Sequence, residues 1–226
     1  MIYVMSDLHG CYEAYIAMLK KIRFSAEDTL YILGDVVDRG PSGIKILLDM
    51  MERKNVIPLL GNHDYTAKRL LEALFLEGQK YHEDKLVDAL KAWTSDGGDA
   101  TLKEFAALKS DEKIKVLKYL NAFLIYEEIE TGGVQYFLSH TVPEKEKMQE
   151  FETCKWQDFT LGEPDYELQY FDDLTIVTGH TPTGLIEEKC NGKIYQKNGH
   201  IAVDCGAVFG GKLGCICLDT LEKFYV

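Results

Sequence analysis

The sequence contains no pair of cysteines with the Cys-x-x-Cys spacing, which argues against a zinc knuckle or a small disulfide-rich fold. Basic residues are scarce: 25 Lys and Arg stand against 37 Asp and Glu, giving a formal net charge of −12 at pH 7. This balance argues against general affinity for nucleic acids or anionic membranes. No run approaches the roughly 18 apolar residues of a membrane-spanning helix, and the N-terminus lacks the features of a secretion signal. We therefore expect a cytoplasmic protein with reduced thiols that binds neither nucleic acid nor membrane.

One pattern occurs five times in the 226 residues: a short apolar run, a small residue, and then a polar side chain able to bind a metal. The runs are residues 2–5, 29–33, 56–60, 134–138 and 174–178, and they lead to Asp7, Asp35, Asn62, His140 and His180. Such runs suit strands buried on both faces, and open α/β folds place ligands at the carboxyl ends of their strands. With 46% hydrophobic residues the chain can bury one sizeable core, so we predict a single α/β domain over residues 1–226.

Helical patterns separate the first strands, at residues 12–22 and 41–52, with Pro41 suited to a first helical turn. From about residue 65 to 120 the sequence is helical and charged and contains no ligand motif, which predicts an inserted helical cap. A polar, glycine-containing stretch at residues 94–99 interrupts this region and suits a hinge or rim loop. The remainder of the chain is expected to be rich in β-hairpins.

Taken singly, each polar residue fits a helix cap or a buried structural histidine as well as it fits a metal ligand. Taken together, they offer carboxylate, amide and imidazole donors, which suit transition metals, whereas magnesium and calcium prefer oxygen alone. These five residues and His9 make six ligands, which exceed the needs of one catalytic zinc. Two ions that share a carboxylate would use the whole set and activate water for attack on a phosphoester. We expect two divalent transition-metal ions, manganese being favoured and iron, zinc, cobalt or nickel being alternatives.

Three motifs make the resemblance to a known family specific. Residues 6–10 (SDLHG), 34–40 (GDVVDRG) and 61–64 (GNHD) resemble the signature motifs of the phosphoprotein phosphatase family, within the calcineurin-like metallophosphoesterase superfamily. The similarity continues through Ser139-His140, residues 179–181 (GHT) and residues 204–206 (DCG), and is greatest to bacterial and phage members. It implies a four-layer α/β/β/α sandwich with mixed sheets.

The resemblance also implies a role for each matching residue. One metal would be held by Asp7, His9 and Asp35, and the other by Asp35, Asn62, His140 and His180, with Asp35 bridging. A hydroxide between the ions would attack phosphorus. His63 would protonate the departing alkoxide, Asp38 would orient His63, and Arg39 would grip a phosphoryl oxygen. Asp38 and Arg39 would otherwise be a plain surface ion pair, but the complete motif around them favours the catalytic interpretation.

The sequence departs from the family pattern in three places. No arginine follows Arg69, so the second phosphate-binding arginine that relatives carry is missing, and Lys155 is the candidate to replace it. Asp64 stands where relatives commonly have Glu, and Cys205 where many have Thr. His82 and His200 match no family position, so solvent or packing roles are expected for both. Packing is expected for Cys215 and Cys217 as well.

These observations favour a monomeric, metal-dependent serine/threonine protein phosphatase acting on phosphoproteins or phosphorylated small molecules. The alternative is a symmetrical dinucleoside tetraphosphate hydrolase, because these enzymes share the motifs. The threonine of the Gly179-His180-Thr181 tripeptide favours the phosphatase over the dinucleotide hydrolase. A third interpretation, an inactive phosphopeptide-binding scaffold, gives no reason to retain the ligands together with His63 and Asp38.

Overall fold

Two five-stranded sheets form the centre of the computed structural model, which describes residues 1–75 and 83–226. In the first sheet the order is β10-β9-β1-β2-β3, and in the second it is β4-β5-β6-β8-β7. The first contains β1 (Ile2–Met5), β2 (Thr29–Ile32), β3 (Val56–Pro58), β9 (Gly214–Cys217) and β10 (Lys223–Tyr225). The second contains β4 (Tyr126–Thr131), β5 (Val134–Ser139), β6 (Leu174–Thr178), β7 (Tyr195–Lys197) and β8 (His200–Ala202).

Both sheets are mixed. In the first, β1, β2 and β3 run parallel, while β9 pairs antiparallel with β1, and β10 pairs antiparallel with β9 at the edge. In the second, β5, β6 and β8 run parallel, and β4 and β7 pair antiparallel at the two edges. Because every ligand-bearing strand predicted from the sequence belongs to a parallel set, the carboxyl ends of these strands lie on the same side of their sheet.

The layers follow from the faces of these strands. One core, including Val4, Leu33, Leu138 and Val177, fills the space between the sheets. A second core lies between the first sheet and helices α1 (Tyr12–Lys21), α2 (Gly43–Met51), α3 (Asn62–Phe75), α5 (Asp99–Ala107) and α6 (Ser110–Asn121). The outer face of the second sheet is covered by loops and short helices around α7 (Lys145–Met148), with α8 (Thr183–Ile186) between β6 and β7. The predicted four-layer sandwich is confirmed, although its last layer is thin.

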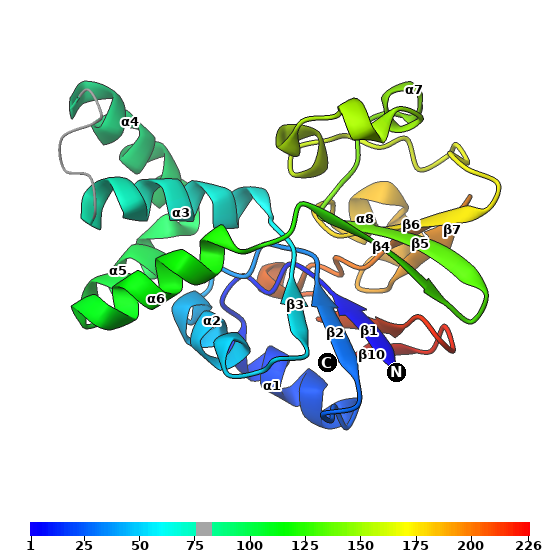
Figure 1. Ribbon diagram of the computed structural model, residues 1–226, viewed down its shortest axis with the longest axis horizontal. Coiled ribbons are helices and arrows are strands. Elements are labelled where there is room, and N and C mark those ends of the chain that lie inside the picture. The colour runs from blue at the N-terminus through cyan, green and yellow to red at the C-terminus, as the bar shows by residue number, and fades with distance from the viewer. Residues whose placement is uncertain (76–82) are drawn as a thin grey trace.

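The predicted cap is a helical lobe at one end of the molecule (Figure 1). It consists of α3, α4 (Glu83–Trp93), α5 and α6, and α3 contacts both α4 and α6. The lobe begins at Asn62, earlier than the predicted start near residue 65, because the predicted ligand Asn62 is itself the first residue of α3. Helix α2 begins at Gly43, two residues after the predicted Pro41. Within the described residues no helix is long and apolar enough to cross a membrane.

Candidate functional site

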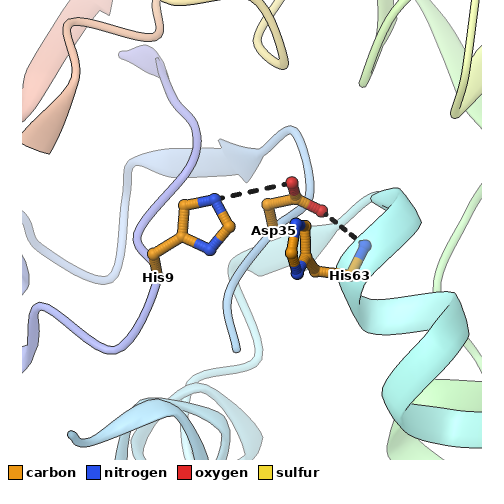
Figure 2. A group of neighbouring side chains, drawn as sticks. All are labelled: His9, Asp35 and His63. Atoms are coloured by element: carbon orange, nitrogen blue, oxygen red, sulfur yellow. Dashed lines mark hydrogen bonds and ion pairs between the residues drawn. The ribbon is translucent and has the colours of Figure 1, made fainter. Parts of the chain in front are cut away.

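The first group of predicted ligands lies just beyond β1 and β2. Asp7, His9 and Asp35 are all buried, with exposures of 1–3%. The His9 Nε2 atom lies 3.6 Å from Asp35 Oδ2 and 4.0 Å from Asp7 Oδ1 (Figure 2 shows His9 and Asp35). His9 Nδ1 lies 2.9 Å from the Val37 carbonyl oxygen, the geometry of a donated hydrogen bond. That bond leaves the Nε2 lone pair facing the carboxylates.

The second group joins the two sheets. His140 and His180 follow β5 and β6, and Asn62 opens α3. His140 Nε2 lies 3.5 Å from Asp35 Oδ2, 3.0 Å from Asn62 Oδ1 and 3.0 Å from His180 Nδ1. The Leu33 carbonyl oxygen lies 2.7 Å from His140 Nδ1 and orients this ring as Val37 orients His9. Asp35 Oδ2 therefore lies between a histidine of each group, the position of a bridging ligand.

These atoms fit a cation better than they fit one another. If His140 Nδ1 donates to the Leu33 carbonyl oxygen, the neutral ring has an acceptor at Nε2. This nitrogen faces the acceptor oxygens of Asn62 and Asp35. Lone pairs that converge in this way suit a metal ion, which accepts them. Within residues 1–75 and 83–226, the His/Cys/Asp/Glu groups able to hold an ion are His9–Asp35–His63 and Asp35–His140–His180. Both groups contain Asp35.

The first of these groups includes His63, to which the family resemblance gives a different role, and omits Asp7. The contacts of His63 favour the resemblance. Its backbone N–H donates to Asp35 Oδ1 at 3.0 Å (Figure 2), while its ring Nδ1 is 2.9 Å from Asp38 Oδ2. The remaining ring nitrogen lies 3.7 Å from Asp96 Oδ2. Because both ring nitrogens have carboxylate neighbours outside the ligand cluster, His63 is better placed to carry a proton than a metal.

The backbone is strained at the same residues. Nine described non-glycine residues have positive φ, and six of them belong to the predicted set: Asp7, His9, Asp35, Asp38, Arg39 and His180. A non-glycine residue in the left-handed region is uncommon, and such strain concentrates at functional sites. The sharp turns after the strands thus aim these side chains inward, as the sequence pattern predicted.

Burial shifts the protonation of the ligands. It lowers the pKa of His9 to about 3, helped by the charges of Arg39 and His63, and lowers the pKa of His180 to about 4. Burial raises the pKa values of Asp7 and Asp35 well above the ordinary aspartate range. Neutral imidazoles are ready to bind a cation, whereas the carboxyl groups must release protons to do so.

The predicted partnership of Asp38 and His63 is embedded in the helical lobe. Asp38 is fully buried. Trp93 Nε1 donates to Asp38 Oδ2 at 2.8 Å, and the Thr101 hydroxyl donates to Asp38 Oδ1 at 2.7 Å while accepting the Asp38 N–H at 2.9 Å. The lobe therefore fixes the carboxylate that contacts His63, in addition to forming a wall of the site.

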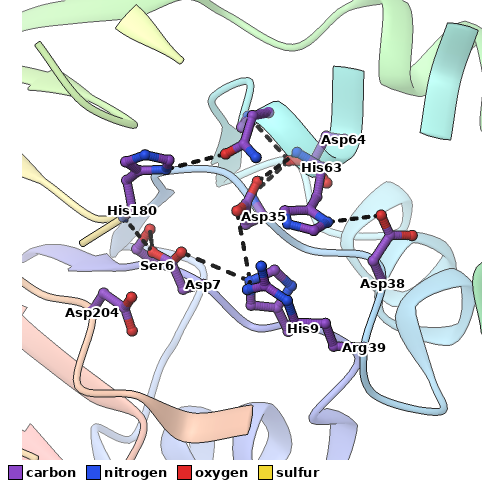
Figure 3. A network of polar contacts seen from close by, with 12 residues as sticks. Ser6, Asp7, His9, Asp35, Asp38, Arg39, His63, Asp64, His180 and Asp204 are labelled. Carbon is purple, nitrogen blue, oxygen red and sulfur yellow. Dashed lines mark hydrogen bonds and ion pairs between the residues drawn. The ribbon is translucent and has the colours of Figure 1, made fainter. Parts of the chain in front are cut away.

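Arg39 lies over the first ligand group (Figure 3). Its Nη1 lies 2.7 Å from His9 Nε2, and its Nη2 lies 3.6 Å from Asp96 Oδ1. The guanidinium also faces the ring of Phe209, with 5.2 Å between its Cζ and the ring centroid. From this position, Arg39 can donate hydrogen bonds to an oxygen of a phosphoryl group bound at the ligand cluster.

Several residues of the site were missed in the sequence. Asp64 was noted only as a departure, but its buried carboxylate accepts the backbone N–H groups of Asp35, Val36, Val37 and Gly61 and so holds the ligand loop. Asp204, 4% exposed, lies near Asp7, and burial raises its pKa to about 6. The motif at residues 204–206 included Asp204 without giving it a role, although its position two residues after β8 was a usable signal. Trp93, Asp96 and Thr101 gave no such signal, because they are remote in sequence from the motifs.

The residues that were expected to pack in the core are buried, as far as they belong to the described part of the chain. Cys215 and Cys217 are buried in β9 within one core, and His200 is buried between Tyr166 and Tyr170. His82 lies outside the described residues. Lys155 is exposed, and its neighbour Trp156 packs on Tyr65 of α3 with 3.8 Å between ring centroids. Replacement of the missing arginine by Lys155 stays a prediction.

Two large cavities adjoin the ligand cluster, and a smaller one of about 330 Å³ also reaches His180. One, of about 530 Å³, is lined by Asn62, His63, Tyr65, Arg69, Trp93 and Asp96 among others. The other, of about 570 Å³, is lined by Arg39, His180, Leu185, Asp204 and Phe209 among others. In Figure 3, His63 and His180 lie on opposite flanks of Asp35, with Asp204 on the His180 side. Both volumes fall within the range of roughly 300–1,000 Å³ found for small-molecule sites.

Known proteins resemble this chain in sequence and in fold. The family model for calcineurin-like phosphoesterases matches residues 1–206. A symmetrical bis(5'-nucleosyl)-tetraphosphatase from Salmonella typhimurium is 33% identical over 117 residues, which are 51% of this chain and 40% of that protein. The counterpart from Wigglesworthia glossinidia brevipalpis is 33% identical over 118 residues, 51% of this chain and 42% of its own length. The matches thus span less than half of these relatives.

Solved structures extend the likeness over the whole chain. A protein described as a candidate diadenosine tetraphosphatase superposes with a TM-score of 0.69 at 17% identity, covering 100% of this chain and 92% of the other. A serine/threonine phosphatase from Saccharomyces cerevisiae has a TM-score of 0.60 at 14% identity, covering 100% of this chain and 79% of the other. At these identities the likeness establishes the fold alone. The match of the family model over residues 1–206 identifies the chain as a member of the calcineurin-like phosphoesterase family.

Proposed function

We propose that this chain hydrolyses the phosphoanhydride chain of a dinucleoside polyphosphate, with the two divalent ions held at the predicted ligands. The observation that carries this proposal is the pair of cavities beside the ligand cluster. A phosphomonoester has one organic group on phosphorus and fills one cavity, whereas a dinucleotide cleaved within its phosphate chain has a nucleoside on each side. The curated relatives, at 33% identity, are described as symmetrical tetraphosphatases, and they support the alternative over the protein phosphatase that the sequence favoured.

The proposed ligands divide as the family resemblance implies. Asp7, His9 and Asp35 would hold one ion, and Asp35, Asn62, His140 and His180 the other. Bound ions of this kind lower the pKa of water and neutralise charge on phosphoryl oxygens. The protein residues do the remaining work: the Val37 and Leu33 carbonyl oxygens fix the rings of His9 and His140, and Asp64 holds the loop of Asp35.

Proton transfer and substrate binding are assigned to the residues above this cluster. The His63 ring would donate a proton to the leaving oxygen, with Asp38 holding its Nδ1. Arg39 would bind a phosphoryl oxygen through its planar fork of donors. Because His63 lines the cavity of Tyr65 and Trp93, this cavity would receive the leaving half of the substrate, and the cavity of Arg39 and Phe209 the retained half.

A serine/threonine protein phosphatase is the second candidate. Its support is the set of signature motifs and the fold shared with the yeast phosphatase. Metal-stripped protein, with manganese added back, is to be assayed on diadenosine tetraphosphate and on a phosphoserine peptide side by side, with Asp35→Asn as the inactive control. Faster release from the dinucleotide supports the proposal, and faster release from the peptide refutes it. No turnover of either substrate also contradicts it, and favours a scaffold.

A further inference from the structure

The carboxylate of Asp96 stands between the two groups that are proposed to receive the substrate. It belongs to the kinked turn Thr94–Gly98, which joins α4 to α5 at the rim of the site. One oxygen lies 3.6 Å from Arg39 Nη2, and the other lies 3.7 Å from His63 Nε2. The side chain is 64% exposed, so it faces the solvent through which substrate must enter.

The turn is fixed at this place by the residues around it. The Gly97 carbonyl oxygen accepts the Arg39 N–H at 2.9 Å, and Gly97 has φ +93°. A Cβ on Gly97 would lie 2.6 Å from the Arg39 nitrogen, so the two backbones are in close contact. Trp93, just before the turn, donates a hydrogen bond to Asp38. Asp96 is therefore a negative charge at a defined position, although its side chain is exposed.

We propose that Asp96 is a specificity-determining residue that disfavours phosphomonoester dianions relative to phosphates that carry a single negative charge. The inference rests on the roles proposed for Arg39 and His63, and not on the identity of the natural substrate. A phosphomonoester carries about −1.5 to −2 charges near pH 7. A phosphoryl group with substituents on both sides carries one. The second negative charge of a monoester is repelled by the Asp96 carboxylate, although Arg39 beside it attracts the same charge.

The sign follows from Coulomb's law. We take a separation of roughly 6 Å between the carboxylate and the phosphoryl group, and an effective dielectric constant between those of a protein surface and water. Each additional negative charge on the phosphoryl group then weakens its binding by a factor of about 3 to 10. Pairing with Asp96 also offsets part of the positive charge of Arg39 that would attract a dianion. Both effects act in the same direction, so removal of the Asp96 charge favours the dianion more than the monoanion.

The test compares two substrates with the same leaving group, p-nitrophenyl phosphate and bis(p-nitrophenyl) phosphate, by kcat/KM on the manganese-loaded full chain. In Asp96→Asn the ratio of monoester to diester activity is expected to rise by about 3- to 10-fold. Asp96→Glu, which keeps the charge, should stay close to wild type. Asp99→Asn, which removes an exposed carboxylate three residues along the chain, should leave the ratio unchanged. In 1 M salt the rise in Asp96→Asn should shrink, because the charge is exposed.

Two outcomes would overturn the proposal. If Asp96→Asn lowers both activities by the same factor, Asp96 only positions Arg39. If the ratio is unchanged, the charge has no effect on the choice of substrate. Failure of the proposed function is a separate result: wild-type protein would then leave diadenosine tetraphosphate intact, while the ratio of the two aryl substrates would still respond to Asp96→Asn.

Discussion

Thr101→Val removes one hydroxyl from the contact between the helical lobe and the site. Thr101 is 1% exposed and lies 63 residues from Asp38 in sequence. Its hydroxyl donates to the Asp38 carboxylate and accepts the Asp38 N–H. Valine has nearly the same shape, so the substitution removes both hydrogen bonds without opening a cavity.

The magnitude follows from these two bonds. A hydrogen bond to a charged group contributes about 1.5–3 kcal/mol, and a buried N–H left without an acceptor costs about 1–3 kcal/mol. Because the two losses share one hydroxyl and are not additive, we expect the free energy of unfolding to fall by about 3 kcal/mol. For a chain of this size that corresponds to a melting temperature lower by about 6–12 °C. The loosened Asp38 should also reduce turnover of an alkyl phosphate by about 10-fold, since it holds the proposed general acid.

The assay combines thermal unfolding with turnover, at a temperature at which the variant remains folded. Thr94→Val is the matched control, because its hydroxyl donates to carbonyl oxygens of the preceding helix α4, those of Leu90 and Lys91, and not to Asp38. A melting temperature and a turnover equal to those of Thr94→Val would refute the reasoning. In that case the lobe would cover the site without supporting Asp38.

Three further results are expected. Asp35→Asn should lose both metals, because Asp35 belongs to both ligand groups, and metal analysis against Asp99→Asn checks this; retention of two ions would exclude a bridging role. His63→Asn should retain metal but lower turnover of an alkyl phosphate by about 10²–10⁴-fold, with a smaller effect on p-nitrophenyl phosphate, whose leaving group needs little protonation; equal effects on the two esters would contradict the acid role. Manganese affinity should rise as pH increases above about 4, the ordinary aspartate pKa, because the raised pKa values of Asp7 and Asp35 mean that binding displaces protons. Burial lowers the pKa of His9 to about 3, so this imidazole is already neutral and the carboxyl groups account for the rise; calorimetric titration across pH 5–7 measures it, and a flat profile would contradict it.

The clustering of the candidate ligand side chains could be predicted because each follows its strand within a few residues. An apolar run, a small residue and a ligand form one local pattern, and parallel pairing then brings the ends of the runs together without further information. At Asp7, Asp35 and His180 the backbone turns sharply after the strand, with positive φ values. The layers of the fold follow from the same strands, since runs buried on both faces need cover on both sides.

The support of the site could not be predicted in the same way. Trp93 and Thr101 reach Asp38 across 55 and 63 residues, and only the packing of α4 and α5 decides that they do. Asp96 depends likewise on a kink whose direction no propensity specifies. The preference for a protein phosphatase rested on one threonine in the Gly179-His180-Thr181 tripeptide, whereas the shape of the two cavities depends on loops far apart in sequence. Local patterns therefore predicted the chemistry better than the substrate.

The predicted ligands follow strands of both sheets, and this has a consequence for the folding of the chain. His140 and His180 reach Asp35, Asn62 and Asp7 across as many as 173 residues of sequence. Contacts of such long range form late in folding. The ligand set is therefore completed only after the two sheets have docked, so metal uptake should be the last step of maturation. Once bound, the ions would link the two sheets. Removal of the ions by a chelator should therefore weaken the packing between the sheets before either sheet unfolds.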